Sequence, residues 1–220
     1  MSNSHKPYCY DYPRPAVTTD AAVFALRDGH MHLLLIERGA EPYKGAWALP
    51  GGFAQPEEDL DACARRELVE ETGVDLADLV PFETFSAPGR DPRGWVISAA
   101  YMALTPSEDL APKADTDAAA VHWFPIDALP PMAFDHAVIV KRALAALRSR
   151  CEAFQPLLAL LPRSFTLSAF QAAYEAVMGA PVDRRNLHKG VLASGLIEET
   201  GEVARGKHRP ARLYRPSRPN

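Results

Sequence analysis

Three glutamates, Glu67, Glu70 and Glu71, stand close together near the end of a predicted helix that stops at Gly73. Their spacing places all three on one stripe of the helix. Like charges three or four residues apart repel by about 0.2–0.5 kcal/mol per pair, and carboxylates in the last turn also oppose the helix dipole. A divalent cation would reverse both penalties, and carboxylate oxygens suit Mg²⁺ or Mn²⁺. The cluster therefore predicts a metal site, with a solvated acidic face as the alternative.

A second group of charged residues lies in the stretch FSAPGRDPRGWVIS, where Arg90 and Arg93 flank Asp91 in a turn that leads into a strand. Arginines in a loop beside a metal site can bind phosphate through two parallel hydrogen bonds. Arg38, at the end of an earlier strand, is a further candidate. We predict that these four residues contact the substrate. The alternatives are a surface turn with a local Arg–Asp pair and a structural salt bridge of Arg38.

The elements that must position these residues follow from apolar periodicity and turn signals. Strands are expected at 16–26, 31–38, LVPFETFSA, RGWVISAAYMALTP and AAAVHWFPI, and helices at about 57–72 and 134–151. Strands and helices do not alternate regularly, so the sequence predicts an α+β fold with a mixed sheet and helices against it. Residues 1–15 are polar and contain proline, which predicts an arm before a domain spanning residues 16–150.

The last part of the chain, residues 151–220, has a different pattern. TLSAFQAAYEAVMG (166–179) starts with a threonine cap and ends in glycine, and DRRNLHKGVLASG (183–195) starts with an aspartate cap, so both are predicted helices. LIEETGEVARGKHRPARLYRP predicts two short strands around a basic loop. Helix, short turn, helix and basic hairpin is the order of a winged helix-turn-helix domain. We place the domain boundary near residues 150–155.

Charge is distributed unevenly along the chain. The net charge is −4, yet residues 183–220 hold nine Lys and Arg against four Asp and Glu, which leaves −9 for residues 1–182. A basic segment on an acidic protein favours nucleic acid as one partner. The three cysteines have no CxxC spacing, which argues against a disulfide framework or a zinc site. Because no stretch resembles a signal peptide or a membrane span, we expect a cytoplasmic protein.

The stretch PGGFAQPEEDLDACARRELVEETG resembles the Nudix box. Nine specified positions match the box at fixed spacing. They are Gly52, Glu58, Arg66, Glu67, Leu68, Glu70, Glu71, Gly73 and Val74. The resemblance covers residues 16–150 and implies a loop–helix–loop on a mixed α/β/α sandwich. It also implies hydrolysis of a nucleoside diphosphate linked to another moiety.

The resemblance implies a role for each matching residue. The Gly52 carbonyl and the three glutamates would hold the metal, Arg66 would orient the carboxylates, and Glu58 would support the site. We therefore expect Glu58, Arg66, Glu67 and Glu71 to be the catalytic residues. The general base stays open, because Glu67 and the acids of a later loop are both possible. Those acids are Glu108, Asp109, Asp115 and Asp117.

Two further stretches, GRDPRGWVIS and YDYPRPAVTTDAAVF, resemble Nudix proteins of NAD metabolism that recognise ADP-ribose. This resemblance implies ADP-ribose or a similar nucleoside diphosphate sugar as the ligand. Bridging metal ions would neutralise its diphosphate and lower the pKa of a bound water.

The C-terminal part resembles the Nudix-related transcriptional regulators of NAD metabolism, through the domain order and the stretches PMAFDHAVIV and RGKHRPARLYRP. In that family ADP-ribose weakens DNA binding. The resemblance implies that the second helix of the domain reads DNA and that the basic loop is the wing. The expected DNA-binding residues are Arg184, Arg185, Asn186, Lys189, Arg205, Lys207 and Arg209. A structural or dimerising module is the alternative.

These observations together predict a Mg²⁺- or Mn²⁺-dependent Nudix hydrolase of ADP-ribose or a similar sugar, joined to a DNA-binding winged helix. One alternative is a repressor of NAD metabolism that senses ADP-ribose and hydrolyses little or none of it. Another is a housekeeping hydrolase with a dimerising C-terminal domain. We expect a homodimer on double-stranded DNA, because a two-fold dimer matches two half-sites.

Overall fold

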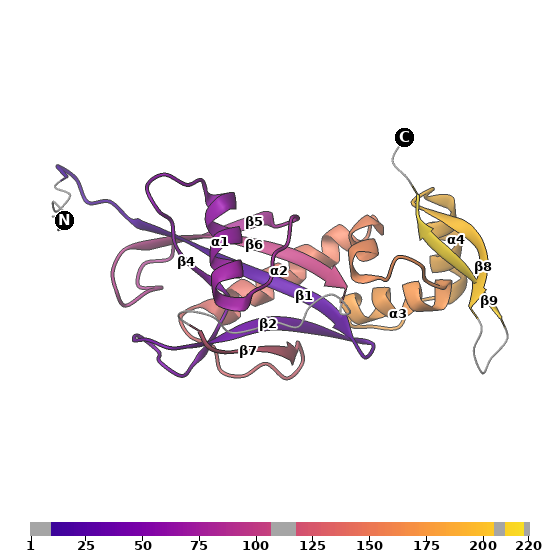
Figure 1. The fold of residues 1–220 in the computed structure, drawn as a ribbon, viewed down its shortest axis with the longest axis horizontal. Coiled ribbons are helices and arrows are strands. Elements are labelled where there is room, and N and C mark those ends of the chain that lie inside the picture. The colour runs from indigo at the N-terminus through magenta and orange to yellow at the C-terminus, as the bar shows by residue number, and fades with distance from the viewer. Residues whose placement is uncertain (1–9, 107–117, 205–209, 218–220) are drawn as a thin grey trace.

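A computed structural model of the chain describes residues 10–106, 118–204 and 210–217. The first part contains β1 (Ala16–Arg27), β2 (His30–Arg38), β3 (Trp47–Ala48), β4 (Gly51–Phe53), α1 (Leu60–Thr72), β5 (Val80–Phe85), β6 (Val96–Pro106), β7 (Ala118–Pro125) and α2 (His136–Cys151). The second contains the 3₁₀ helix η2 (Gln155–Leu160), α3 (Leu167–Met178), α4 (Arg184–Ala193), β8 (Ile197–Ala204) and β9 (Ala211–Pro216). The two parts lie one after the other along the long axis of the molecule (Figure 1).

Seven strands form one mixed sheet of order β3-β2-β1-β6-β5, with β4 paired to β1 and β7 paired to β2. Strands β1 and β6 run parallel, from Ala16 beside Val96 to Leu26 beside Pro106. The other strand pairs of this sheet are antiparallel. The predicted α+β class and mixed sheet are therefore confirmed.

Helices α1 and α2 cover opposite faces of the sheet, because successive side chains of a strand point to opposite sides. Val23 of β1 belongs to a buried cluster with Leu68 of α1. The next residue, Phe24, belongs to another cluster with Ile139 of α2. This is the α/β/α sandwich that the resemblance implied (Figure 1).

Helix α1 ends as predicted but starts later. The side chain of Asp59 caps it by accepting a hydrogen bond from the Ala62 N–H, so the helix begins at Leu60 rather than near residue 57. At the other end Gly73 adopts a left-handed conformation (φ 68°) and donates its N–H to the Val69 carbonyl. Glycine is favoured at this position because it has no side chain to clash. The three glutamates therefore lie in the last two turns, as expected.

The second part has the predicted order of elements. Thr166 caps α3 by accepting from the Ala169 N–H, and Gly179 ends α3 with φ 73°. Asp183 caps α4 by accepting from the Asn186 N–H. Strands β8 and β9 pair as an antiparallel hairpin. The arrangement is that of a winged helix-turn-helix domain.

One hydrophobic core extends across both parts. Leu147 and Cys151 of α2 belong to the same cluster of buried side chains as Phe170 and Val177 of α3. Arg148 of α2 also donates from Nε to the carbonyl of Val177 at 2.9 Å. Helix α2 therefore links the sheet to the winged helix, and the boundary near residues 150–155 stays a prediction. Within the described ranges, no helix is both long enough and apolar enough to cross a membrane.

Candidate functional site

The start of β4 lies directly against the glutamates of α1. A Cβ added to Gly52 would come within 2.4 Å of the carboxyl carbon of Glu67, so any larger residue here would displace that carboxylate. The N–H of Gly51 donates to Oε2 of Glu71 at 2.8 Å. The fold thus brings the Gly51–Gly52 backbone and two of the predicted metal ligands together.

Arg66 binds three carboxylates at once. Its Nη2 and Nε donate to Glu58 at 2.6 and 2.9 Å, and its Nη1 donates to Glu67 at 2.8 Å and to Glu70 at 3.0 Å. The hydrogen bonds from Arg66 lower the pKa of Glu58 to about 2. This geometry is what the expected roles require, with Arg66 orienting the carboxylates and Glu58 holding Arg66 in place.

The carboxylate of Glu71 lies in an environment that disfavours its charged form. Burial, together with the nearby carboxylates of Glu67 and Asp20, raises the pKa of Glu71 to about 8. The Gly51 N–H and Arg38 act in the opposite direction. Burial also raises the pKa of Glu67. A bound divalent cation would favour the charged form of both carboxylates.

We expect the stability of the metal-free protein to fall as pH rises from about 4.5 to about 8, because folding keeps Glu71 protonated in a range where the unfolded chain ionises it. Below the unfolded pKa this contribution to the free energy of unfolding is fully present, and it is lost as pH rises through the folded pKa. The measurement is the urea midpoint across this range in EDTA. Glu71→Gln should flatten the slope relative to wild type, and equal slopes in both proteins would contradict the assignment.

The site supplies oxygen ligands, which fit a hard cation such as Mg²⁺ or Mn²⁺. In the part of the chain that the structure describes, no three His, Cys, Asp or Glu side chains converge on one point that could hold a metal ion. Two of the expected ligands, Glu67 and Glu70, are hydrogen-bonded to Arg66. The assignment of Gly52, Glu67, Glu70 and Glu71 as metal ligands therefore stays a prediction.

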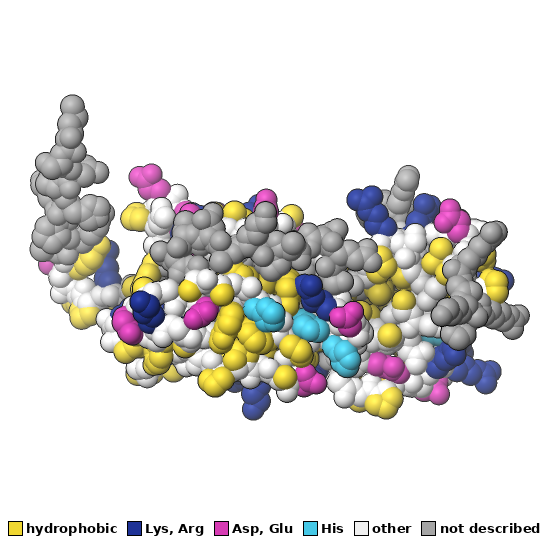
Figure 2. Space-filling view, turned by 60° about the horizontal axis from the view of Figure 1, so that its bottom comes forward, with side chains coloured by type: hydrophobic (Ala, Val, Ile, Leu, Met, Phe, Trp, Pro, Cys, Tyr) yellow, Lys and Arg dark blue, Asp and Glu magenta, His cyan; other side chains and the backbone are white. Residues whose placement is uncertain are grey.

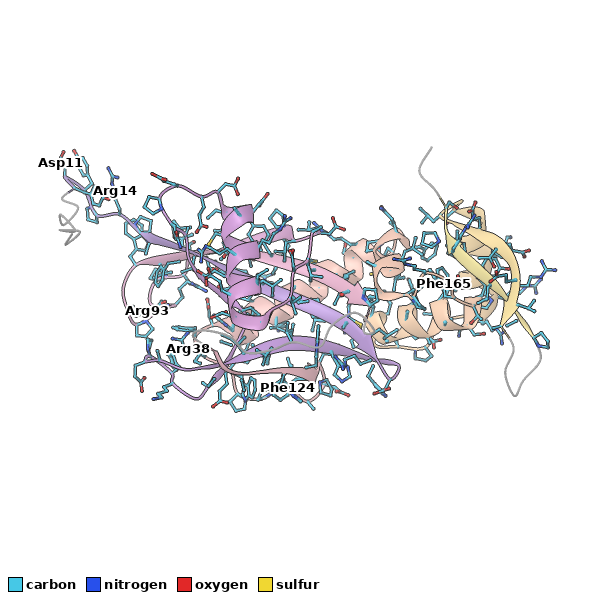
Figure 3. All side chains as sticks on the ribbon, viewed as in Figure 1. Asp11, Arg14, Arg38, Arg93, Phe124 and Phe165 are labelled. Atoms are coloured by element: carbon cyan, nitrogen blue, oxygen red, sulfur yellow. The ribbon has the colours of Figure 1, made fainter. Side chains whose placement is uncertain are left out.

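A cavity of about 50 Å³ beside this loop is lined by Gly52 and by the arginines Arg38 and Arg93, among others. The two guanidinium groups lie over one aromatic ring, with Cζ of Arg38 at 4.9 Å and Cζ of Arg93 at 5.2 Å from the ring centre of Phe134. Figure 3 shows Arg38 and Arg93 at the same end of the domain. This cavity beside the Nudix box is therefore lined by all four predicted substrate-binding residues, since Arg90 and Asp91 line it as well.

Arg93 and Arg38 are held in different ways. The buried carboxylate of Asp91 accepts from Arg93 Nη2 at 2.6 Å, which is the local pair considered as an alternative. Arg38 donates to the carbonyls of Pro42 and Ala40. It forms no ion pair with a residue that the structure describes, so its salt-bridge alternative is not supported.

Arg90 lines the same cavity, but its side chain is held in an ion pair. Its side chain is only 5% exposed and donates to both carboxylate oxygens of Asp135, at 2.7 and 3.0 Å. It also lies 3.6 Å from Asp20. This ion pair, made across 45 positions of sequence, weighs against direct substrate binding by Arg90.

Several residues at the cavity were not singled out from the sequence. Phe53 and Phe134 lie on either side of Arg93, with Cζ at 4.7 and 5.2 Å from the ring centres. Asp20 and His136 also line the cavity. A signal that could have identified His136 is the pair of polar residues, Asp135 and His136, before the apolar run in PMAFDHAVIV.

A larger cavity lies elsewhere. It has a volume of about 440 Å³, and residues of both domains line it, including His30, Arg148 and Glu175. It contains none of the predicted site residues. Size alone therefore does not identify the site. We place the site at the smaller cavity, because the predicted site residues line it.

Helix α4 presents its basic residues to solvent. Arg184, Arg185, Asn186 and Lys189 are exposed, whereas Leu187 is buried against the domain. Lys and Arg side chains gather at the winged-helix end on the face drawn in Figure 2. The remaining predicted DNA-binding residues and loop acids lie outside the described residues. They are Arg205, Lys207, Arg209, Glu108, Asp109, Asp115 and Asp117.

Comparison with known proteins agrees with this two-part arrangement. The NUDIX domain model matches residues 17–143, and the model of the NrtR DNA-binding winged helix domain matches residues 157–215. The ADPR responsive transcriptional repressor NtrR of Acinetobacter baylyi is 35% identical over 209 residues, which cover 93% of this chain and 83% of that protein.

Of two further matches, one covers part of the chain and the other covers nearly all of it. The ADP-ribose pyrophosphatase of Methanocaldococcus jannaschii is 38% identical over 130 residues, which cover 59% of this chain and 73% of that protein. The crystal structure of Shewanella oneidensis NrtR complexed with a 27mer DNA is 29% identical, with a TM-score of 0.77 and coverage of 91% of this chain and 93% of that one. The chain therefore belongs to the Nudix family and carries a C-terminal winged-helix domain of the NrtR type.

Proposed function

We propose that this chain is a divalent-metal-dependent hydrolase of ADP-ribose or a similar nucleoside diphosphate sugar, joined to a winged helix that binds DNA. The observation that carries the proposal is that the Nudix box and two arginines meet at one cavity. Gly52, Arg38 and Arg93 line this cavity, and Gly52 lies directly against the carboxylate of Glu67.

Each group would act on a different part of the ligand. Arg38 and Arg93 would bind the diphosphate, and Glu67 and Glu71 would hold the cation. When bound, the cation would neutralise the diphosphate and lower the pKa of the attacking water. Hydrolysis would break one P–O bond of the diphosphate and yield AMP and ribose 5-phosphate. The cavity of about 50 Å³ is smaller than such a ligand needs, so the arginines and their aromatic neighbours would move apart on binding.

A second candidate function is a repressor that senses ADP-ribose with little or no hydrolysis. It is favoured by the relative named as an ADPR responsive transcriptional repressor, which this chain matches along almost its whole length. The two candidates are compatible, because coupling between sites is reciprocal: a ligand that weakens DNA binding must itself bind less tightly to the DNA complex. A purely dimerising C-terminal domain is less well supported, since the matching winged-helix model is described as DNA-binding.

The deciding experiment incubates the full-length protein with ADP-ribose and either Mg²⁺ or Mn²⁺ and measures AMP and ribose 5-phosphate. Turnover that requires the metal would support the hydrolase. Binding of ADP-ribose without turnover would support the sensor. The oligomeric state, for which we propose a homodimer, is read from light scattering of the same sample.

Arg93→Ala should weaken ADP-ribose binding by about 10- to 100-fold, because a hydrogen bond to a charged group contributes about 1.5–3 kcal/mol. Its side chain is 38% exposed and therefore accessible to a ligand. Isothermal titration calorimetry in EDTA measures the dissociation constant without turnover. Arg142→Ala, on the exposed surface of α2, is the matched control for loss of one charge. Equal affinity in the two variants would remove Arg93 from the binding site.

A further inference from the structure

We infer that His136 and Asp20 are positioning residues that fix the loop 49–52 against the glutamates of α1. Both line the same cavity as Arg38 and Arg93, and neither is among the predicted catalytic or metal-binding residues. The inference rests on the proposed metal-dependent function, since it concerns how that site is held in shape.

The first step is a hydrogen bond between the loop and helix α2. The backbone N–H of Leu49 donates to Nδ1 of His136 at 2.9 Å, and both residues are buried. Because Nδ1 accepts, the ring proton lies on Nε2. Nε2 faces Oδ1 of Asp20 at 3.4 Å. The segment is therefore tied to a residue 87 positions away, and the Leu49 N–H sets the tautomer that points the Nε2 proton of that residue toward Asp20.

The second step concerns Asp20 and the strand that carries it. Asp20 pairs with Gly51 in the β1–β4 ladder, and the neighbouring Ala21 donates its N–H to the Pro50 carbonyl at 2.8 Å. The hydroxyl of Ser98 donates to Oδ2 of Asp20 at 2.5 Å. The backbone around Asp20 thus pairs with this segment, while the Asp20 carboxylate contacts Ser98 and His136, and the residue is only 6% exposed.

The third step explains why Arg90 is buried. Asp135 is the residue before His136 and occupies the N-cap position of α2, yet its side chain caps no N–H of the helix. It accepts two hydrogen bonds from Arg90 instead. Arg90 therefore holds the start of α2, and with it the ring of His136, in one position. This gives Arg90 a positioning role in the site.

The loop that these residues hold has little freedom to adapt. A Cβ on Gly51 (φ 155°) would lie 2.0 Å from the Thr19 carbonyl oxygen, and one on Gly52 would collide with Glu67. Gly51 also donates the hydrogen bond to Glu71. A small shift of the loop would move the Gly52 carbonyl and both carboxylates relative to each other. Residues that orient metal ligands in this indirect way typically affect metal affinity or activity by about 10- to 100-fold.

Two substitutions of one residue test the inference. His136→Asn keeps an acceptor near the position of Nδ1, whereas His136→Gln keeps a polar group near Nε2 and loses the acceptor for Leu49. We expect His136→Gln to weaken Mn²⁺ binding about 10- to 100-fold and to lower kcat similarly with little change in KM. We expect His136→Asn to remain within about threefold of wild type, because the Leu49 N–H stays paired.

The measurements are a titration of the full-length protein with Mn²⁺, followed by electron paramagnetic resonance of the free ion, and steady-state kinetics. Cys151→Ala, which removes a buried group at the far end of α2, controls for a general loss of stability. Equal Mn²⁺ affinities in the Asn and Gln variants would overturn the inference. So would a loss in Cys151→Ala as large as that in His136→Gln. If the wild type binds Mn²⁺ but turns nothing over, the proposed hydrolysis fails and the Mn²⁺ comparison still decides the positioning role.

Discussion

Glu67→Gln is expected to lower turnover of ADP-ribose by about 10²- to 10⁴-fold, the range for loss of a positioned catalytic group. The change is nearly isosteric, so the fold and the close approach of Gly52 should remain. The neutral amide would remove one of the negative charges that hold the cation, and it would leave Arg66 with one fewer charged partner.

The measurement is kcat and KM with Mg²⁺ for the variant and for Glu57→Gln, an exposed glutamate outside the matched positions of the box. Glu71→Gln and Glu70→Gln should behave like Glu67→Gln if all three carboxylates are ligands. Unchanged rates in the Glu67 variant, with intact Mn²⁺ binding, would remove this carboxylate from the site.

The double variant Arg184→Ala with Arg185→Ala is expected to bind duplex DNA at least about tenfold more weakly, since an arginine that reads a base typically contributes about 1–3 kcal/mol. Both side chains lie in the first turn of α4 and are exposed. If they bind phosphates instead, the slope of log affinity against log salt should fall by about 0.9 for each phosphate that the variant no longer neutralises.

The affinity is measured by fluorescence anisotropy over a range of salt concentrations. Arg142→Ala with Arg150→Ala removes the same charge from exposed positions of α2 and serves as the control. A double variant with wild-type affinity and slope would exclude the start of α4 from the DNA interface. A decrease of equal size in the control would attribute the effect to net charge.

The sequence alone predicted the helix and its chemistry at the Nudix box, because the relevant interactions are local. The cap, the glutamate stripe and the glycine that ends α1 all lie within one short stretch. The predicted start of the helix, at about residue 57, is three residues too early. The cap hydrogen bond is made by the side chain of Asp59, so Pro56 and Glu57 lie before the helix.

The second side of the site could not be predicted in the same way. The pairing of Arg90 with Asp135 and of Leu49 with His136 joins segments that only the folded sheet brings together. A turn that contains Arg, Asp and Arg is equally compatible with a phosphate site and with a buried ion pair. The choice between them depends on which residue of α2 lies opposite, and no local pattern contains that information.

The core that α2 shares with α3 means that the two domains are not thermodynamically independent. Side chains of the sheet, of α2 and of the winged helix belong to one buried cluster. Arg148 also donates a hydrogen bond to the carbonyl of Val177, near the end of α3. Unfolding either domain would therefore expose apolar surface of the other, which favours a single cooperative transition. Free energy gained when a nucleotide binds beside the Nudix box would then also protect the DNA-binding helices from unfolding, although they never touch that nucleotide.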